Sequence, residues 1–423
     1  MRKLSKVGIK KTRLRWRYKQ FLYALAYIWR RLLFRTTFIA ITGSVGKTTA
    51  KELIGAIFSA HFPTAKTLYN QNDFYGVPRT ILRVRPWHRF AVVEIGTDRP
   101  GLVGRSARLV RPDIAVVLAV ARTHTNAFKA LEDTAAEKAQ ILETLSSKGV
   151  AILNGEDNWV RKMADGCRCK VKMFGMLARS KGLDLWADEV SSKWPARLTL
   201  RAHTESQTQW VKTNLVGEQW VNAILAALAT ATACGIPLTA AAAQIQRVKP
   251  FPARMQPVTL AGGAVVLRDE SDNSPDTLLA ALRVLEESVA TRRVLVIGDV
   301  SDFRGNPRQR FKALGKTASQ IFDLAVFVGE HGHHAARTAV ASGMKRESAV
   351  HFIDPHSAAV YLKSELRDGD LVLLKGRASD HLSRVFFAQF GNIGCWKTRC
   401  RKTFVCDFCK ELRPEYDLQA MLN

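Results

Sequence analysis

Residues 38–52 read Phe-Ile-Ala-Ile-Thr-Gly-Ser-Val-Gly-Lys-Thr-Thr-Ala-Lys-Glu: a short apolar strand, a glycine turn and the start of a helix. This order is typical of a phosphate-binding loop, because backbone N–H groups and the positive end of the helix converge on phosphate oxygens. Lys47 is expected to reach the β- and γ-phosphates of ATP, and the Thr48 hydroxyl is expected to ligate Mg²⁺. The residues predicted to bind the nucleotide here are Gly43, Ser44, Val45, Gly46, Lys47, Thr48 and Thr49.

Apolar runs of strand length recur on both sides of this loop, and helical stretches such as 135–145 and 225–234 lie among them. Alternation of strands and helices predicts an α/β fold with parallel sheets. A Pro-containing stretch at 249–253 is the expected linker between two such domains. The predicted strands are residues 38–42, 91–94, 114–118, 150–153, 264–267, 294–297, 324–328 and 371–374.

The charge of the chain is strongly positive: its 423 residues include 64 basic and 37 acidic side chains, a net charge of +27. Such a balance favours anionic partners. Residues 1–35 carry twelve of the basic side chains and no acidic one, and Phe21, Leu25, Ile28 and Leu32 follow at helical spacing. A basic, amphipathic helix of this kind predicts apposition to an anionic membrane surface. The same pattern fits a basic helix that packs on the protein, or one that binds nucleic acid, although nucleic acid is the least favoured partner.

The cysteines divide into two groups. Cys167, Cys169 and Cys234 are scattered, as in a reduced cytoplasmic protein. The other four form a C-x4-C-x5-C-x2-C tail whose spacing resembles a structural Zn²⁺ site, with free thiols as the alternative. The predicted zinc ligands are Cys395, Cys400, Cys406 and Cys409.

The phosphate loop departs from the usual pattern, because Ile41 stands where its first glycine is expected. The shortened form T-G-S-x-G-K-T-T-x-K-E resembles the Mur ligase family, and most closely its D-alanyl-D-alanine-adding branch. The resemblance runs in order from about residue 38 to residue 382. Its further motifs are N-Q-N at 70–72 with G-V-P at 76–78, E-I-G at 94–96, R-P-D-I-A at 111–115, E-K-A at 137–139, G-D at 298–299, and G-D…K-G at 369–376.

The resemblance implies a role for individual residues of this sequence. Lys138 matches the lysine that the family carbamylates, Arg254 matches the Arg of its G-R motif, and Ala253 replaces the glycine of that motif. Glu94 and His124 are expected to join Thr48 around Mg²⁺. Nucleotide contacts are expected from Asn222, Arg254 and Asp269, and substrate contacts from Asn70, Asn72 and Lys375. The implied catalytic residues are Lys47, Lys138, His124 and Arg254.

The resemblance also implies the domain plan. A basic segment (1–36) precedes a central ATP-binding domain (37–250), a Rossmann-like ligase domain (251–394) and the cysteine tail (395–423). Only about 36 residues precede the phosphate loop, which is too short for the family's N-terminal UDP-binding domain.

We therefore expect an ATP-dependent ligase that joins a carboxylate to an amino acid or dipeptide through an acyl phosphate. Three alternatives stay open. One is the same chemistry on a membrane-associated acceptor without UDP, of the capsule or poly-amino-acid type, with the enzyme held at the inner face of the membrane. The second is a nucleic-acid-binding P-loop ATPase. The third is a non-catalytic scaffold that retains only nucleotide binding.

Overall fold

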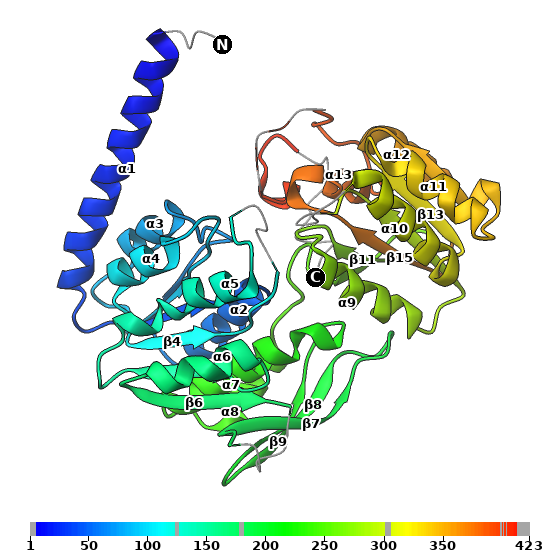
Figure 1. The fold of residues 1–423 in the computed structure, drawn as a ribbon. Helices are drawn as coiled ribbons and strands as arrows, with labels where there is room; N and C mark the ends of the chain where they lie inside the picture. Colours follow the sequence, from blue (N-terminus) through cyan, green and yellow to red (C-terminus); the bar gives the residue numbers. More distant parts are fainter. Residues whose placement is uncertain are drawn as a thin grey trace. The chain divides into compact units, whose positions relative to one another are not determined.

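The computed structural model describes residues 6–122, 127–176, 182–300, 306–397, 400, 402 and 404–412, with side chains from Arg17 onward. The chain forms two compact units (Figure 1). The first comprises residues 1–190, 199–212 and 220–248, and the second comprises residues 191–198, 213–219 and 249–423. The division therefore falls at 248/249, beside the expected 250/251, and two short segments of the earlier chain pack with the second unit.

The first unit is built on a nine-stranded sheet in the order β2-β3-β1-β4-β5-β6-β7-β8-β9. The strands from β2 to β7 pair in parallel, whereas β8 and β9 form an antiparallel pair. The strands are β1 (Thr37–Thr42), β2 (Thr64–Lys66), β3 (Phe90–Glu94), β4 (Ile114–Val117), β5 (Val150–Asn154), β6 (Lys170–Gly175), β7 (Leu185–Ser191), β8 (Thr199–Thr204) and β9 (Thr208–Lys212).

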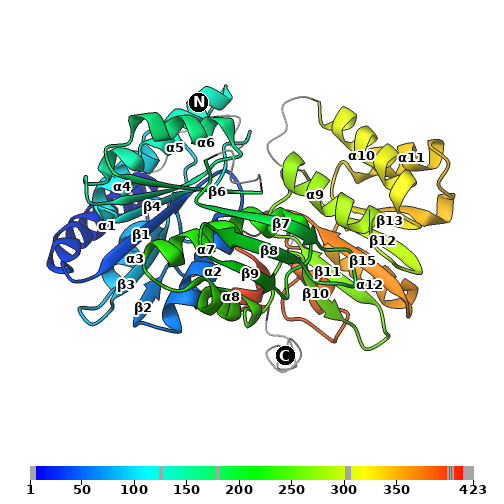
Figure 2. The same ribbon diagram turned by 90° about the horizontal axis from the view of Figure 1, so that it is seen from below.

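Helices cover both faces of this sheet, with α2, α7 and α8 on one face and α3, α4, α5 and α6 on the other (Figure 2). Strands β1, β3 and β4 are apolar and buried along nearly their whole length, as expected where both faces of a parallel sheet are covered. The helices are α1 (Lys6–Leu32), α2 (Lys47–Ser59), α3 (Gly76–Arg83), α4 (Leu102–Val110), α5 (Leu131–Ala139), α6 (Asn158–Lys162), α7 (Val221–Ala233) and α8 (Leu238–Gln246).

The register of the central strands determines where the site lies. Ile41 of β1 pairs with Glu94 of β3, and Thr42 pairs with Val117 of β4. The phosphate loop after β1 and the carboxylate at the end of β3 therefore meet at the carboxyl edge of the sheet, where ligands bind in parallel α/β sheets.

Helix α1 packs on the first unit along one face only. Ala26 and Leu33 are buried, the Trp29 indole N–H donates to the Val84 carbonyl (2.9 Å), and Arg30 donates to the Val110 carbonyl (2.5 Å). On another face, side chains at a three- and four-residue spacing stay exposed: Tyr18, Phe21, Leu25, Ile28 and Leu32. Phe21 is 63% exposed and Ile28 60%. No helix in the described ranges combines the length and apolarity that crossing a bilayer requires.

The second unit has a six-stranded sheet in the order β10-β11-β15-β12-β13-β14, parallel except for the β10–β11 pair. Contacts between elements group α10 and α11 together and α12 with α13. The elements are β10 (Gln256–Thr259), β11 (Val265–Asp269), α9 (Pro275–Glu286), β12 (Arg292–Ile297), α10 (Pro307–Ile321), β13 (Leu324–Val328), α11 (Gly332–Ala341), β14 (Ala349–Phe352), α12 (Pro355–Glu365), β15 (Asp370–Lys375) and α13 (Ser383–Phe387).

The α/β fold with parallel sheets is confirmed, and the eight predicted strands are present. One helix was predicted wrongly: the stretch 135–145 is not continuous, because α5 ends at Ala139 and a separate 3-10 turn follows at Leu142–Thr144. The sequence did not indicate β2, β6 to β10 or β14, which are short or half-exposed and carry no long apolar run.

Candidate active site

The phosphate loop has the backbone geometry that its glycines allow. Gly46, directly before α2, has a φ of 81°, in the left-handed region that favours glycine. A Cβ on Gly43 would lie 2.9 Å from the Leu118 Cβ, too close for any other residue. The N-cap residue of α2 is Gly46, which has no side chain to cap the first turn, and the first N–H groups of a helix have no intrahelical acceptor. The loop thus leaves backbone donors at a helix N-terminus for an anion.

Two side chains hold the loop in shape. The Ser44 hydroxyl donates to the Ala121 carbonyl (3.0 Å) and accepts from the Ala121 N–H (2.9 Å). The Lys47 ammonium folds back over the loop and donates to the carbonyls of Gly43 (2.7 Å) and Ser44 (3.1 Å). The expected phosphate-binding cation therefore lies directly over the loop.

Glu94 is the centre of the polar contacts next to the loop. Its side chain is fully buried, and its Oε1 accepts hydrogen bonds from the Thr48 hydroxyl (3.1 Å) and from Asn72 Nδ2 (2.7 Å). The structure thus brings together Thr48 and Glu94, both predicted to ligate Mg²⁺, with Asn72, predicted to contact substrate. Asn70 is exposed nearby, and its carbonyl accepts from the Asn72 N–H (2.8 Å).

Lys51 also belongs to this group, although no role was predicted for it beyond its place in the loop motif. Its ammonium is fully buried, 3.9 Å from Glu94 Oε2 and 2.7 Å from Glu52 Oε1. Among the described residues, Oε2 of Glu94 has no hydrogen-bond partner. A buried carboxylate oxygen that lacks a donor, beside a threonine hydroxyl, is an oxygen set of the kind that Mg²⁺ prefers.

Lys138 lies on α5 and is 3% exposed. Burial, reinforced by the positive charge of Lys47, lowers the pKa of Lys138 to about 7. Its neighbour Glu137 accepts hydrogen bonds from the backbone N–H groups of Gly101 (2.6 Å) and Val103 (2.8 Å) at the start of α4. A carboxylate at a helix N-terminus is stabilising, so Glu137 fixes α5 and hence positions Lys138.

The remaining predicted residues of the first unit have different outcomes. Asn222 lies in the first turn of α7, and the next residue, Ala223, is within van der Waals reach of the space beside Gly46. The Asn222 Oδ1 is buried without a hydrogen-bond partner among the described residues. Its nucleotide contact stays a prediction. His124 lies outside the described residues.

In the second unit, the predicted residues Asp269 and Lys375 form a buried ion pair. The Lys375 ammonium, fully buried, lies 2.6 Å from Asp269 Oδ2 and donates to the Asp272 carbonyl (2.6 Å). Their strands are neighbours, with Asp269 paired to Lys375 in register. The other Asp269 oxygen accepts from the Met255 N–H (3.1 Å), which ties the Arg254 turn to this pair.

Arg254 stands on a turn with an unusual backbone. The flanking residues Ala253 (φ 57°) and Met255 (φ 48°) are both in the left-handed region. A left-handed conformation suits glycine and costs other residues roughly 1–2 kcal/mol. The left-handed backbone explains why the family motif has a glycine at the position of Ala253. The alanine adopts the same turn, but with backbone strain. Arg254 itself is half-buried.

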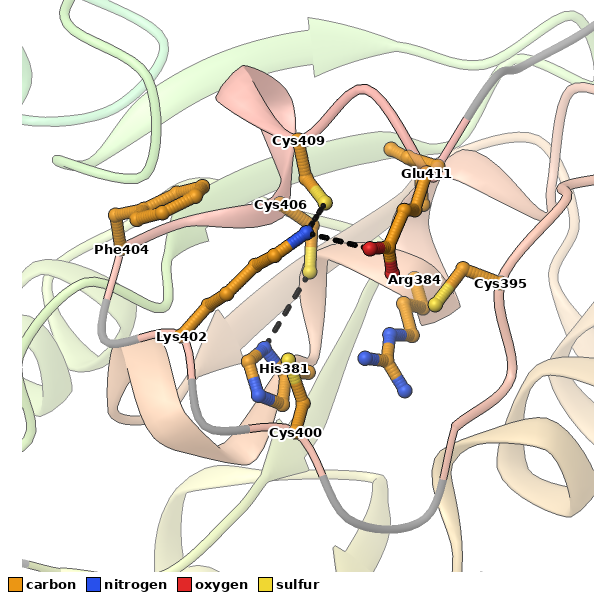
Figure 3. A pocket seen from close by; sticks show the side chains of 10 residues that line it. His381, Arg384, Cys395, Cys400, Lys402, Phe404, Cys406, Cys409 and Glu411 are labelled. Atoms are coloured by element: carbon orange, nitrogen blue, oxygen red, sulfur yellow. Dashed lines mark hydrogen bonds and ion pairs between the residues drawn. The ribbon is translucent and has the colours of Figure 1, made fainter. Parts of the chain in front are cut away.

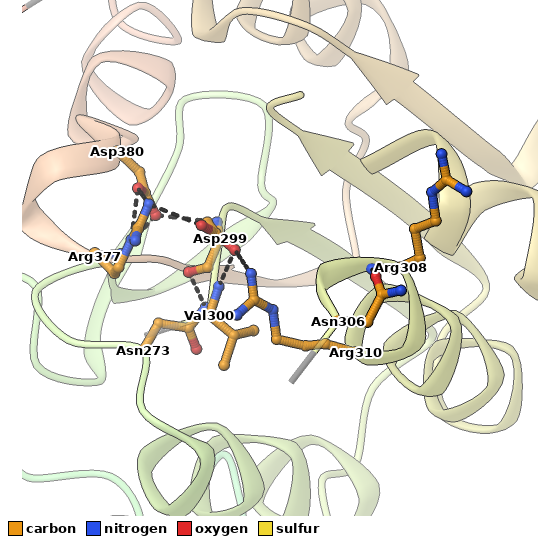
Figure 4. A network of polar contacts seen from close by, with 8 residues as sticks. All are labelled: Asn273, Asp299, Val300, Asn306, Arg308, Arg310, Arg377 and Asp380. Carbon is orange, nitrogen blue, oxygen red and sulfur yellow. Dashed lines mark hydrogen bonds and ion pairs between the residues drawn. The ribbon is translucent and has the colours of Figure 1, made fainter. Parts of the chain in front are cut away.

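The G-D pair at 298–299 lies in a charged network (Figure 4). The Asp299 carboxylate accepts from Arg310 Nη2 (2.8 Å) and pairs with Arg377 (3.2 Å). Arg377 also pairs with Asp380 (2.7 Å), which accepts from the Asp299 N–H (3.1 Å). These ion pairs and hydrogen bonds connect the segment that follows β12 to the segment that follows β15.

The predicted ligands of magnesium and zinc do not form a complete metal site in the part of the chain that the structure describes. Among the residues that the structure describes, no three His, Cys, Asp or Glu side chains are placed to hold an ion together. The seven cysteines are free thiols, with Cys395 and Cys406 buried. Neither the magnesium nor the zinc expectation is confirmed by this arrangement.

Comparisons with known proteins agree with this geometry. Residues 41–231 match the Mur ligase middle domain, and residues 253–378 match the Mur ligase, glutamate ligase domain. The UDP-N-acetylmuramoyl-tripeptide–D-alanyl-D-alanine ligase of Escherichia coli is 30% identical over 371 residues, which cover 87% of this chain and 80% of the relative. The Mycobacterium bovis enzyme of the same name is 28% identical, over 86% and 74% of the two chains.

Solved structures show the same architecture. MurF from Acinetobacter baumannii has a TM-score of 0.80 and 25% identity, over 88% of this chain and 80% of that one. MurF ligase from Thermotoga maritima, solved in complex with ADP, has a TM-score of 0.75 at 21% identity, over 88% and 83%. The chain belongs to the Mur ligase family. It is an ATP-dependent ligase of the acid–amino-acid type, and this expectation from the sequence is confirmed.

Proposed function

We propose that this chain joins D-alanyl-D-alanine to the terminal carboxylate of a UDP-muramoyl tripeptide, with ATP as the energy source, in the cytoplasm. The observation that carries the proposal is the contact between Thr48 and the buried carboxylate of Glu94 beside the phosphate loop. An oxygen-rich site next to this loop supports binding of the ATP phosphates there. The names of the curated relatives favour this pair of substrates.

The chemistry follows from the groups that the first unit presents. Loop N–H groups and Lys47 hold the phosphates and neutralise charge as the substrate carboxylate attacks the γ-phosphorus. An acyl phosphate forms and ADP leaves. The amine of the dipeptide then attacks the acyl carbon, the new amide forms, and phosphate and a proton are released.

The oxygen donors of this site fit Mg²⁺. Thr48 and Glu94 would hold the ion, because the hydroxyl and the carboxylate are adjacent and Glu94 Oε2 lacks a hydrogen bond among the described residues. The ion would supply positive charge to the phosphate oxygens when bound.

Lys138 fits the carbamylated lysine that the family resemblance implies. A primary amine must be neutral to add to CO₂, and a pKa lowered to about 7 leaves about half of the Lys138 amines neutral at that pH. The carbamate would be an anion near the positive charge of Lys47, which adds to burial in disfavouring the ammonium form of Lys138.

A peripheral membrane position is a further part of this proposal. The exposed stripe on α1, defined as Tyr18, Phe21, Leu25, Ile28 and Leu32, keeps roughly half of its side-chain surface open to solvent, and basic side chains flank it. An apolar stripe between basic residues suits an anionic bilayer surface. Such a position serves a UDP-linked acceptor or one anchored in the membrane.

The decisive test is ADP formation by the full chain with ATP and Mg²⁺, with the tripeptide acceptor and D-alanyl-D-alanine supplied together or separately. We expect turnover only with both, and a loss of about 100-fold or more in the Lys47→Ala variant. The Lys170→Ala variant, at an exposed strand position, is the matched control and should keep full activity. ATP turnover that responds to DNA or RNA and ignores both substrates would refute the proposal.

A further inference from the structure

Five side chains of types that bind zinc line one pocket of the second unit: His381, Cys395, Cys400, Cys406 and Cys409 (Figure 3). His381 follows the charged network of Asp299, Arg377 and Asp380, whereas the cysteines belong to the tail. The pocket therefore joins the tail to a segment that adjoins a family motif. The ligase function makes no use of these five groups.

The tail is firmly anchored in this unit. Val405, Cys406 and Leu412 are buried and belong to or pack beside the core formed with β11 to β15. The fully buried Arg268 donates to both oxygens of Asp407, at 2.7 Å and 2.9 Å. A bidentate, buried pair of this kind fixes orientation as well as position. The segment between Cys406 and Cys409 is thereby held against the domain.

One edge of a tetrahedral site is already present. Cys406 Sγ lies 3.5 Å from His381 Nδ1, and both side chains are more than nine-tenths buried. Zinc bonds of about 2.3 Å to sulfur and about 2.0 Å to nitrogen, at tetrahedral angles, place the two ligand atoms roughly 3.5 Å apart. The backbone of Cys400 also lies against the imidazole. Figure 3 shows Cys395 set apart from the other three cysteines.

Cationic side chains surround these sulfurs. The Lys402 ammonium donates to Cys409 Sγ (3.0 Å) and pairs with Glu411 (3.1 Å), in the space that the cysteines border (Figure 3). Arg384 is buried beside Cys406. Among the described residues no three ligands converge, and Lys402 lies with its ammonium next to the Cys409 sulfur. Its side chain is about one-third exposed, so it can turn outward and leave the position to a metal cation.

We propose that Cys400, Cys406, Cys409 and His381 bind one Zn²⁺, which fastens the tail to the loop between β15 and α13. Three thiolates, a neutral imidazole and Zn²⁺ carry one net negative charge, which the adjacent Arg384 offsets. The set differs from the four-cysteine set expected from spacing, because His381 takes the place of Cys395. This zinc site is separate from the ligase reaction. The proposal would hold even if the enzyme used an acceptor other than a UDP-muramoyl tripeptide.

The test measures zinc by mass spectrometry in the full chain, purified under reducing conditions and equilibrated with Zn²⁺ alone. We expect about one zinc per chain in the wild type and in Cys395→Ser, and less than a tenth of that in Cys409→Ser. His381→Asn should weaken zinc binding by at least tenfold in competition with a chelator. Absence of zinc from the wild type overturns the proposal. Zinc lost from Cys395→Ser but retained by His381→Asn overturns the ligand set.

A second measurement does not depend on variants that might fold poorly. Wild-type protein is alkylated with and without zinc, and each cysteine is located by peptide mass spectrometry. Zinc should protect the half-buried Cys400 and Cys409 at least tenfold, and Cys395 should react equally in both samples. Equal labelling of all four with and without zinc overturns the site.

Discussion

The Thr48 hydroxyl donates a 3.1 Å hydrogen bond to Glu94 Oε1, although the two residues are 46 positions apart in the sequence. They meet because β1 and β3 are parallel neighbours whose carboxyl ends lie at one edge of the sheet. The phosphate loop follows one strand and the carboxylate ends the other. This contact ties the nucleotide loop to the predicted magnesium ligand.

Glu94→Gln removes the charge of this carboxylate and keeps its shape. We expect ligase turnover to fall by about 100-fold and the Mg²⁺ concentration for half-maximal rate to rise, because a neutral amide is a poor magnesium ligand. Glu52→Gln is the matched control, since Glu52 pairs with the same Lys51 from α2. It should keep the magnesium dependence of the wild type. Equal effects in both variants would mean that Glu94 serves only to neutralise Lys51.

Lys138 predicts a pH dependence of stability. Its pKa is about 7 in the folded protein and near 10.5 in the unfolded chain, so the unfolded chain binds the extra proton between these values. The free energy of unfolding therefore increases as pH rises from about 7 to about 10. Below about pH 7 the buried lysine is charged, and the full cost of burying that charge lowers stability. Lys138→Met lacks the penalty. Urea unfolding should show it more stable than the wild type at pH 6.5, with the difference shrinking by pH 9.5.

The same variant separates this effect from catalysis. Lys138→Met should lose ligase activity at every pH, and added bicarbonate should raise wild-type activity only. Activity that survives the substitution would contradict the carbamate role without touching the stability prediction.

The buried ion pair between Lys375 and Asp269 predicts that removing one of its two charges lowers stability. Removing one partner of a buried pair leaves the other charge uncompensated, so Lys375→Met should lower the free energy of unfolding by about 3–5 kcal/mol. Lys375→Met with Asp269→Asn should recover part of this, because no buried charge is left. Lys363→Met, at an exposed position of α12, is the control and should change stability by less than about 0.5 kcal/mol. A stable but inactive Lys375→Met would instead assign the lysine to substrate.

The left-handed backbone at Ala253 predicts that replacing this residue with glycine increases stability. Glycine relieves the left-handed strain of roughly 1–2 kcal/mol but adds freedom to the unfolded chain, worth about 0.5–1 kcal/mol. Ala253→Gly should therefore raise the free energy of unfolding by up to about 1.5 kcal/mol in urea titrations. Ala264→Gly, at a buried alanine without positive φ, should lower it. If both substitutions destabilise equally, the turn is not strained.

The exposed stripe on α1 predicts vesicle binding. The wild type should sediment with anionic vesicles and not with neutral ones at low salt, because both apolar and basic contacts are needed. Phe21→Ser with Ile28→Ser should reduce the bound fraction about tenfold or more. Leu279→Ser with Val289→Ser, two exposed apolar residues of the second unit, should not. Binding that persists in the first pair, or that DNA replaces equally well, would contradict a membrane face.

Much of the fold could be predicted because its signals are local. A glycine loop between a buried strand and a helix is readable at 38–52, and apolar runs of four or five residues are readable as buried strands. The strands β6 to β9 escaped because a half-exposed strand lacks such a run. The helix expected over 135–145 ends early, at Ala139, and local periodicity does not show where it stops.

The amino-acid sequence by itself determined the phosphate loop, the α/β class and the family, since each depends on residue types at short, fixed spacing. Tertiary structure alone decided which distant groups share a site: Glu94 with Thr48, Lys375 with Asp269, and His381 with Cys406. It also decided which face of α1 is buried. Strand order and packing govern these contacts, because they arise from pairing between segments far apart along the chain, where no local pattern records the partner.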